Sequence, residues 1–158
     1  MIVIQTKPQA IESVRILLIG NNPIEMSSLL DVIAKIPDRS ISTEIAFDVK
    51  SITSRLLKFE PTLILIDDNI GQKELSLTIQ SLSHNIKTRE VPITVIKNSN
   101  YTEALVSADI LDYLLKINLT TESIYNTIKN ALKFKRTRKL LVEAYNRRKA
   151  LLMRLAGS

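Results

Sequence analysis

The sequence predicts an α/β fold in which a doubly wound, five-stranded parallel sheet is followed by a long C-terminal helix. Short runs of consecutive apolar residues alternate along the chain with segments whose apolar residues recur at helical spacing. The clearest run, residues 63–66, lies between Pro61 and Gly71 and leads directly into Asp67 and Asp68. A strand that is apolar on both faces is typical of a parallel sheet covered by helices on both sides.

The remaining elements follow from the same patterns and from turn residues. Strands are expected at 14–19, 41–47, 63–66, 92–96 and 111–115. Helices are expected at 24–36, 49–59, 75–82 and 101–108, and a last helix at 120–155. Asn22 suits the N-cap of the first helix and Pro23 its first turn, while Thr120 or Thr121 suits the cap of the last. Strict alternation of strands and helices favours parallel pairing.

Composition narrows the function classes. The chain has 158 residues, no cysteine and 4% aromatic residues, so we expect one domain with an aliphatic core and no disulfide or cysteine metal site. No apolar stretch approaches the roughly 20 residues of a membrane span, and the N-terminus lacks the pattern of a signal peptide. We therefore expect a cytoplasmic protein. The only histidine, His84, falls in a predicted polar connection at 84–90 and is interpreted as a surface loop residue.

Charge divides the chain. Residues 129–154 contain ten Lys or Arg and one acid, Glu143, a local charge of +9 within a total of +6, so the rest carries −3. We predict a lead-in at 1–12, a domain at 13–133 and a basic helical extension at 134–158.

Polar residues collect where the predicted strands end. Asp67, Lys97 and Lys116 each end a strand, and Gly20 with Asn21 ends the first one. The carboxyl ends of parallel strands converge at one edge of the sheet, where ligands bind in such folds. A carboxylate beside lysines is either a structural ion-pair cluster or a site that handles phosphate.

Four motifs in order resemble the receiver domain of two-component response regulators, the CheY-like family. The third strand, Pro61-Thr-Leu-Ile-Leu-Ile-Asp67, is similar to the family's Pro-Asp-Leu-Ile-Leu-Leu-Asp. The fifth, Asp112-Tyr-Leu-Leu-Lys116, is similar to its Asp-Tyr-Leu-x-Lys. Val91-Pro92 matches the pair before the fourth strand, and the first strand runs into Asn22-Pro23. The resemblance covers residues 13–133 and implies a flavodoxin/CheY-like sheet of order 2-1-3-4-5.

The resemblance also implies roles for individual residues. Asp67 matches the phosphoacceptor, and Lys116 matches the lysine that contacts the acceptor and its phosphoryl group. Asn69 matches the position whose carbonyl coordinates Mg²⁺, and Tyr113 matches the switch aromatic.

Several departures from the family predict a degenerate site. Gly20 and Asn21 replace the acidic pair, so Asp67 would be the main charged ligand left for Mg²⁺, a cation that prefers anionic oxygen ligands. Asp68 is expected to point to the opposite face of the strand. Lys97 replaces a Thr or Ser and is expected to pair with Asp67. Ile117 replaces a Pro, so a trans peptide bond is expected before it.

We therefore predict a signalling receiver that acts as a protein-interaction module, with impaired or absent Mg²⁺-dependent phosphorylation of Asp67. No enzymatic activity and no required cofactor are expected, and Mg²⁺ would bind weakly at most. The alternative is a functional phospho-accepting regulator at Asp67. A metal-dependent phosphoryl enzyme would need more carboxylates at the strand ends than Asp67 and Asp68.

The basic extension has several interpretations. A heptad frame puts Phe134, Leu141, Ala144, Leu151 and Leu155 on one seam, and Arg138 and Arg148 interrupt it. The segment would form a homodimer or lead to an output module, fold back as an additional helix, bind an anionic partner, or remain solvated. The expected partner is a sensor kinase or an output module. Nucleic acid is not favoured, since no DNA-reading motif follows.

Overall fold

The computed structural model describes residues 13–37, 40–98 and 109–157 and confirms the predicted fold class. The strands are β1 (Ser13–Ile19), β2 (Ser40–Ala46), β3 (Leu63–Asp67), β4 (Ile93–Lys97) and β5 (Ile110–Leu115). All neighbours pair in parallel in the order β2-β1-β3-β4-β5, the order that the resemblance implied. The helices are α1 (Pro23–Ala34), α2 (Val49–Phe59), α3 (Gln72–His84) and α4 (Thr121–Ala156), with the 3-10 turns η1 (Asp68–Ile70) and η2 (Lys116–Asn118).

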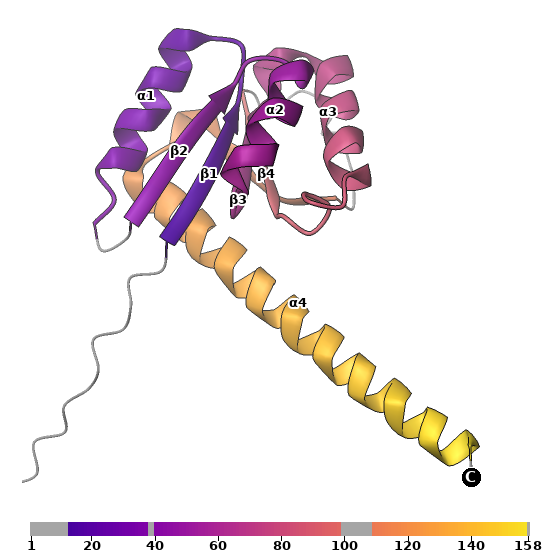
Figure 1. Ribbon diagram of the computed structural model, residues 1–158. Helices are drawn as coiled ribbons and strands as arrows, with labels where there is room; N and C mark the ends of the chain where they lie inside the picture. Colours follow the sequence, from indigo (N-terminus) through magenta and orange to yellow (C-terminus); the bar gives the residue numbers. More distant parts are fainter. Residues whose placement is uncertain (1–12, 38–39, 99–108, 158) are drawn as a thin grey trace, which may run out of the picture.

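The sheet is covered on both faces, as the unalternating strands predicted (Figure 1). Along β3, Leu63 and Leu65 face the core under α1 and α4, whereas Ile64 and Ile66 face the core under α2 and α3. All four side chains are at most 1% exposed. β3 is thereby held at the centre of the molecule, and the residue that ends it, Asp67, has a fixed position.

Caps confirm the predicted helix starts. The Asn22 side chain accepts hydrogen bonds from the amides of Ile24 and Glu25, and Pro23 occupies the first turn of α1. Thr120 caps α4 and exchanges hydrogen bonds with Ser123. Each cap satisfies amides that the first turn of a helix leaves without partners.

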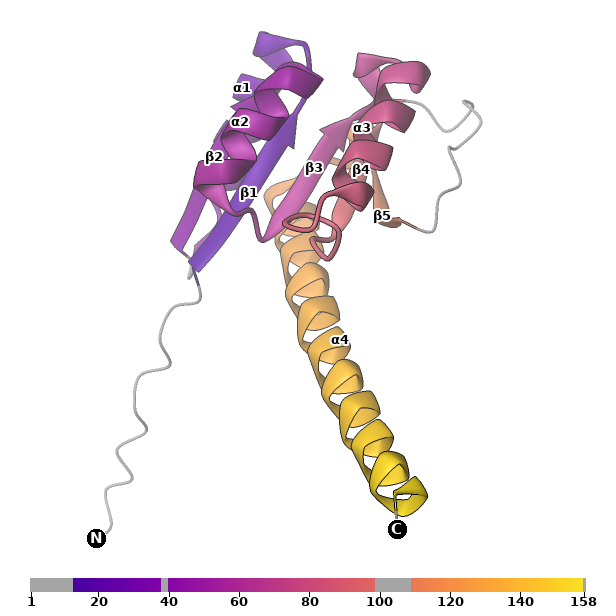
Figure 2. The same cartoon turned by 45° about the vertical axis from the view of Figure 1, so that its right-hand side comes forward.

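α4 is one continuous helix of 36 residues, so the alternative in which its second half folds back is wrong. Its first turns pack on the sheet, and the remainder leaves the body of the molecule (Figures 1 and 2). Within the described part of the chain, no helix combines the length and the apolar composition that crossing a membrane requires.

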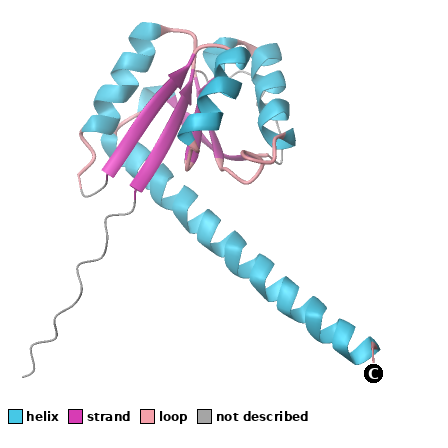
Figure 3. Ribbon diagram, in the orientation of Figure 1, coloured by secondary structure: helices cyan, strands magenta, loops and turns pink. Residues whose placement is uncertain are grey.

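Smaller differences concern the ends of elements (Figure 3). β4 ends at Lys97, so this lysine is the last strand residue. His84, predicted in a loop, is the exposed last residue of α3, and its Nδ1 lies 2.6 Å from the Gln80 carbonyl oxygen in the last turn of the helix. The predicted lead-in at 1–12 and the predicted helix at 101–108 lie outside the described residues.

Candidate functional site

Asp67 lies at the carboxyl end of β3 and is only 2% exposed. Its Oδ1 accepts hydrogen bonds from the backbone N–H of Asn69 at 2.9 Å and from the side-chain amide of Asn98 at 3.1 Å. The first bond forms because the chain turns into η1 directly after the strand. A buried carboxylate requires such donors, since burial removes it from water.

Lys116 is the cation of the site. It begins η2 at the end of β5, and its ammonium donates to Asp67 Oδ2 at 2.9 Å, Glu25 Oε2 at 2.5 Å and Asn98 Oδ1 at 2.9 Å. An ammonium has three N–H donors, so all of them are used. Burial acts to lower the pKa of Lys116, but the hydrogen bonds to Glu25 and Asp67 outweigh it and raise the pKa above 10.5. The lysine is therefore held in its charged form.

Glu25 is a member of the site that sequence reasoning missed. It lies in the first turn of α1, directly after the β1 end that lacks the acidic pair. Besides Lys116, its Oε2 accepts a hydrogen bond of 2.7 Å from the Asn69 side chain. An acid in the first turn of a helix has an ordinary explanation, the positive end of the helix dipole. The sequence feature that could have indicated a role in the site is the short distance along the chain between Glu25 and the end of the first strand.

Asp68 and Asn98 also join the site, and for Asp68 the prediction was wrong. Alternation of faces holds only within a strand, and Asp68 already belongs to η1. Its Oδ1 accepts from the backbone N–H of Asn98 at 3.1 Å and from the Asn98 side-chain amide. Asn98 thereby connects Asp68, Asp67 and Lys116, and nothing in the sequence pattern singled it out.

Lys97 does not pair with Asp67, contrary to expectation. Its ammonium lies over the ring of Tyr113, 5.3 Å from the ring centroid, a cation–π geometry. Burial raises the pKa of Tyr113 above 10.0. Tyr113 is the register partner of Val95, and Lys97 lies two residues further along β4, so the two side chains are diagonal neighbours on one face of the sheet. Their contact lies beside the carboxylate cluster and adds no cation to it.

Gly20 and Asn21 occupy the positions of the family's acidic pair, and side chains of this protein fill the region where those acids would lie. A Cβ added to Gly20 would lie 2.6 Å from Met26 Cε, so the thioether of α1 fills the region beside the glycine. The Asn21 side-chain amide donates to the Asn69 carbonyl oxygen at 3.5 Å. That carbonyl is the group that the resemblance assigned to Mg²⁺.

The residues present do not fit a Mg²⁺ ion. The Lys116 ammonium lies between the carboxylates of Glu25 and Asp67, in the position a shared cation would need. The Asn69 carbonyl is engaged by Asn21. In the described ranges, no group of three or more His, Cys, Asp or Glu side chains is arranged to hold a metal. Mg²⁺, which prefers anionic oxygen ligands, would have to displace the Lys116 ammonium from the carboxylates of Glu25 and Asp67.

The peptide bond between Lys116 and Ile117 is trans, as the replacement of Pro predicted. Ile117 itself is 81% exposed in η2 and makes no part of the cluster.

We predict that Gly20→Asp destabilises the protein by about 1 kcal/mol, because the new side chain would overlap the flexible end of Met26, which has to shift within a packed region. The companion variant Met26→Ala leaves a cavity when made alone. In the double variant Gly20→Asp/Met26→Ala, the same cavity makes room for the aspartate. In urea unfolding, the loss of unfolding free energy in the double variant is expected to be about 1 kcal/mol smaller than the sum of the losses in the two single variants. Strict additivity would show that Met26 does not limit the space at Gly20.

Structural comparisons identify the fold. A putative response regulator from Chloroflexus aurantiacus is 15% identical, with a TM-score of 0.67 over 77% of this chain and 99% of that one. The receiver domain of a sensor histidine kinase from Pseudomonas aeruginosa, solved with a magnesium ion in its active site cleft, is 15% identical, with a TM-score of 0.66 and the same coverage. NtrX from Brucella abortus is 16% identical, with a TM-score of 0.72 over 86% of this chain and 31% of that protein.

The chain therefore has the fold of response-regulator receiver domains. No protein-family model matches the sequence, and no curated protein matches it either. At these identities the likeness concerns the fold, so function has to be argued from the site.

Proposed function

We propose that this protein is a signalling module of the two-component type that works by binding other proteins, without Mg²⁺-dependent phosphorylation of Asp67. The observation that carries the proposal is the bridge formed by Lys116 between Asp67 and Glu25. A receiver that accepts a phosphoryl group needs a cation to neutralise the charge that arrives there. Here the cation is a side chain that is already bound to two carboxylates and an amide.

The local charges support the proposal. Phosphorylation would place a dianionic group near Glu25 and Asp68, in a described cluster whose one salt-bridged cation is Lys116. Like charges at close range oppose such a product. The internal bridge also ties α1 to η2, so the edge of the sheet is held in one arrangement without a ligand.

A sensor kinase or an output module is the proposed partner, and the contact surface is proposed to lie on α4. From Lys133 to Gly157 every residue is exposed, including Leu140, Leu141 and Leu152. Monomeric proteins rarely leave so many large apolar side chains on one segment without a partner. A homodimer through this helix stays a prediction.

The test uses the full chain with Mg²⁺ and acetyl phosphate, with intact mass as the readout. Asp67→Asn is the control for the acceptor, and Asp68→Asn is the matched neighbour. A receiver domain with a complete acidic pair serves as the positive control. We expect no mass gain in this protein under conditions that load the positive control. A Mg²⁺-dependent gain of one phosphoryl group that persists in Asp68→Asn and disappears in Asp67→Asn would overturn the proposal.

Beryllofluoride provides a second readout, since it forms an acyl-phosphate mimic at receptive aspartates. Backbone NMR shifts at Asn69, Asn98 and Tyr113 would report its binding. We expect no shifts at these amides when Mg²⁺ and beryllofluoride are added together. Saturable shifts would mean that the Lys116 bridge opens and that the alternative, a working phospho-acceptor, is correct.

A further inference from the structure

Beyond Lys133, no side chain of α4 is buried against the part of the domain that the structure describes, although the Arg138 guanidinium reaches back to within 3.8 Å of the Glu90 carboxylate. Burial along the helix stops at Leu132, and residues 134–156 extend it for about 34 Å at 1.5 Å per residue. Figures 1 and 2, seen from two directions, both show this half of the helix leaving the sheet.

This exposed half of α4 has an apolar face. At about 100° per residue, seven apolar residues between positions 140 and 155 fall within an arc of about 140°. They are Leu140, Leu141, Ala144, Tyr145, Leu151, Leu152 and Leu155. The large side chains among them are 59% to 68% exposed. The rest of the circumference is mainly basic, with Lys135, Arg136, Lys139, Arg147, Lys149 and Arg154.

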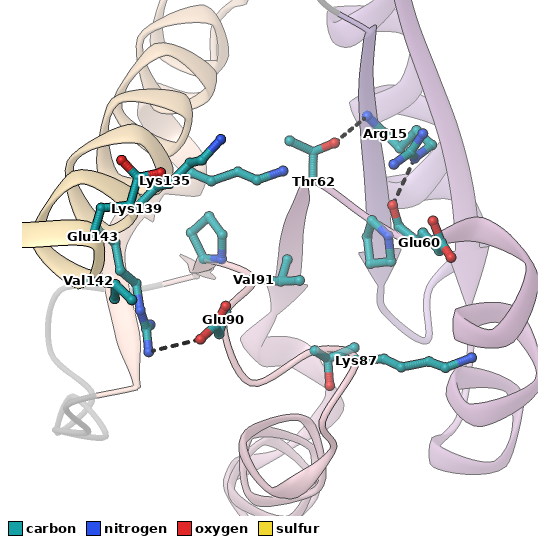
Figure 4. A pocket seen from close by; sticks show the side chains of 14 residues that line it. Arg15, Glu60, Thr62, Lys87, Glu90, Val91, Lys135, Lys139, Val142 and Glu143 are labelled. Atoms are coloured by element: carbon teal, nitrogen blue, oxygen red, sulfur yellow. Dashed lines mark hydrogen bonds and ion pairs between the residues drawn. The ribbon is translucent and has the colours of Figure 1, made fainter. Parts of the chain in front are cut away.

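The apolar face points away from the domain. The buried residues of α4, among them Ile128 and Leu132, lie about 140° around the helix axis from the centre of the apolar arc. On the domain side, Lys135, Lys139 and Val142 line a cleft of about 590 Å³ near the amino ends of β3 and β4. Figure 4 shows the two lysines reaching into this cleft toward Thr62. The domain therefore uses the basic side of the extension and leaves its apolar arc to solvent.

The charged residues on this half of α4 indicate which kind of partner can cover the apolar arc. Residues 134–156 contain eight Lys or Arg and one acid, Glu143. Arg148 lies in the middle of the apolar arc, between Leu141 and Leu155, whereas Glu143 lies on the opposite side of the helix. A second copy of the helix, in either orientation, would cover Arg148 without offering it a carboxylate. An unpaired guanidinium in a seam opposes association.

We propose that the apolar arc of residues 140–155 is the docking surface for an acidic amphipathic helix of another protein. Apolar side chains of that helix cover the leucines, and its carboxylates pair with Arg148 and with the flanking Arg147 and Arg154. This proposal names the partner class for the interaction role proposed above. It does not depend on the state of Asp67, so the two can fail separately.

The test measures binding of the full-length protein to a synthetic helical peptide of about four heptads. The peptide has Leu at the seam positions, Glu at the flanking positions and one Glu placed opposite Arg148. Two control peptides replace the flanking Glu by Lys, or the seam Leu by Ser. Fluorescence anisotropy gives the dissociation constants, and circular dichroism verifies that each protein variant keeps its helix content.

Two pairs of neighbouring residues provide matched variants. Arg148→Glu changes the arc, and Lys149→Glu makes the same charge change outside it. Leu151→Asp changes the arc, and Met153→Asp removes an equally exposed apolar side chain on the other side of the helix. We expect the acidic peptide alone to bind. We expect Arg148→Glu and Leu151→Asp to weaken it at least about tenfold, and the two controls less than about threefold.

Other occupants would overturn the proposal. A chain that sediments as a dimer at micromolar concentration and ignores the acidic peptide would mean that a second copy covers the arc. Binding to phosphatidylserine vesicles or to duplex DNA, without binding to the peptide, would assign the surface to an anionic membrane or to nucleic acid. Equal losses in Arg148→Glu and Lys149→Glu would show unspecific charge attraction. Any of these results leaves the phosphorylation test on Asp67 unaffected.

Discussion

Replacing Lys116 by methionine is expected to lower the free energy of unfolding by about 3 kcal/mol, the lower end for removal of one partner from a buried ion pair. Asp67 is 2% exposed and would be left with only the backbone amide of Asn69 and the side-chain amide of Asn98 as hydrogen-bond donors. The lower end applies because the side chains of Lys116 and Glu25 are 25% and 30% exposed, so water screens part of the interaction. Urea unfolding measures the loss.

The matched control is Lys97→Met. Lys97 also ends a strand at this edge, but it lies over Tyr113 and outside the carboxylate cluster. Its replacement is expected to change stability by no more than about 0.5 kcal/mol. The double variant Asp67→Asn/Lys116→Met removes both charges and is expected to recover part of the loss. Equal losses in Lys116→Met and Lys97→Met would contradict the assignment of Lys116 as the bridging cation.

The pH dependence follows from the same bridge. The pKa of Lys116 is raised in the folded protein above its usual value of 10.5, so folding favours the protonated lysine. The resulting stabilisation is fully present below pH 10.5 and is lost as the pH rises through the folded pKa. The unfolding free energy of the wild-type protein should therefore fall above pH 10.5 more steeply than that of Lys116→Met. Parallel curves would show that the lysine is not more strongly protonated in the folded state.

Replacing Ile128 by alanine is expected to cost about 3 kcal/mol, because the side chain is 1% exposed and its removal leaves a cavity between α4 and the sheet. Leu141 belongs to the same helix and is 65% exposed. Its replacement by alanine is expected to change stability by no more than about 0.5 kcal/mol. Chemical unfolding of both variants locates the point at which α4 stops contributing to the domain.

The opposite result has a clear meaning. A loss of more than about 1.5 kcal/mol in Leu141→Ala would show that the exposed half of α4 is buried in solution, by self-association or against the domain. Repeating the measurement at several protein concentrations separates these two cases, since only self-association makes stability depend on concentration.

Much of the fold could be predicted because the deciding interactions are local or periodic. Unbroken apolar runs identify strands that are buried on both faces, and β3 has such a composition. Asn22 and Pro23 mark the start of α1 through hydrogen bonds and a backbone angle that involve only neighbouring residues. The length of α4 follows from the absence of Gly and Pro between its cap and Gly157.

The site was predicted only in part. Asp67 ends β3 and Lys116 directly follows β5 at the carboxyl ends of the strands, and the structure brings the two side chains within hydrogen-bond distance. The prediction that Lys97 pairs with Asp67 was wrong, because the Lys97 side chain at the end of β4 lies over the ring of Tyr113. Asp68 was misplaced, because the backbone turns into η1 one residue after Asp67.

By itself, therefore, the sequence determined the order of the elements, the parallel sheet and the edge at which the polar residues gather. Only the tertiary structure decided what those residues do to one another. Glu25 and Lys116 are 91 positions apart, and their contact depends on where the packing of the whole domain places α1 and η2. Local patterns cannot encode that distance, whereas a difference of a few ångströms decides whether a carboxylate meets a metal ion or an ammonium group.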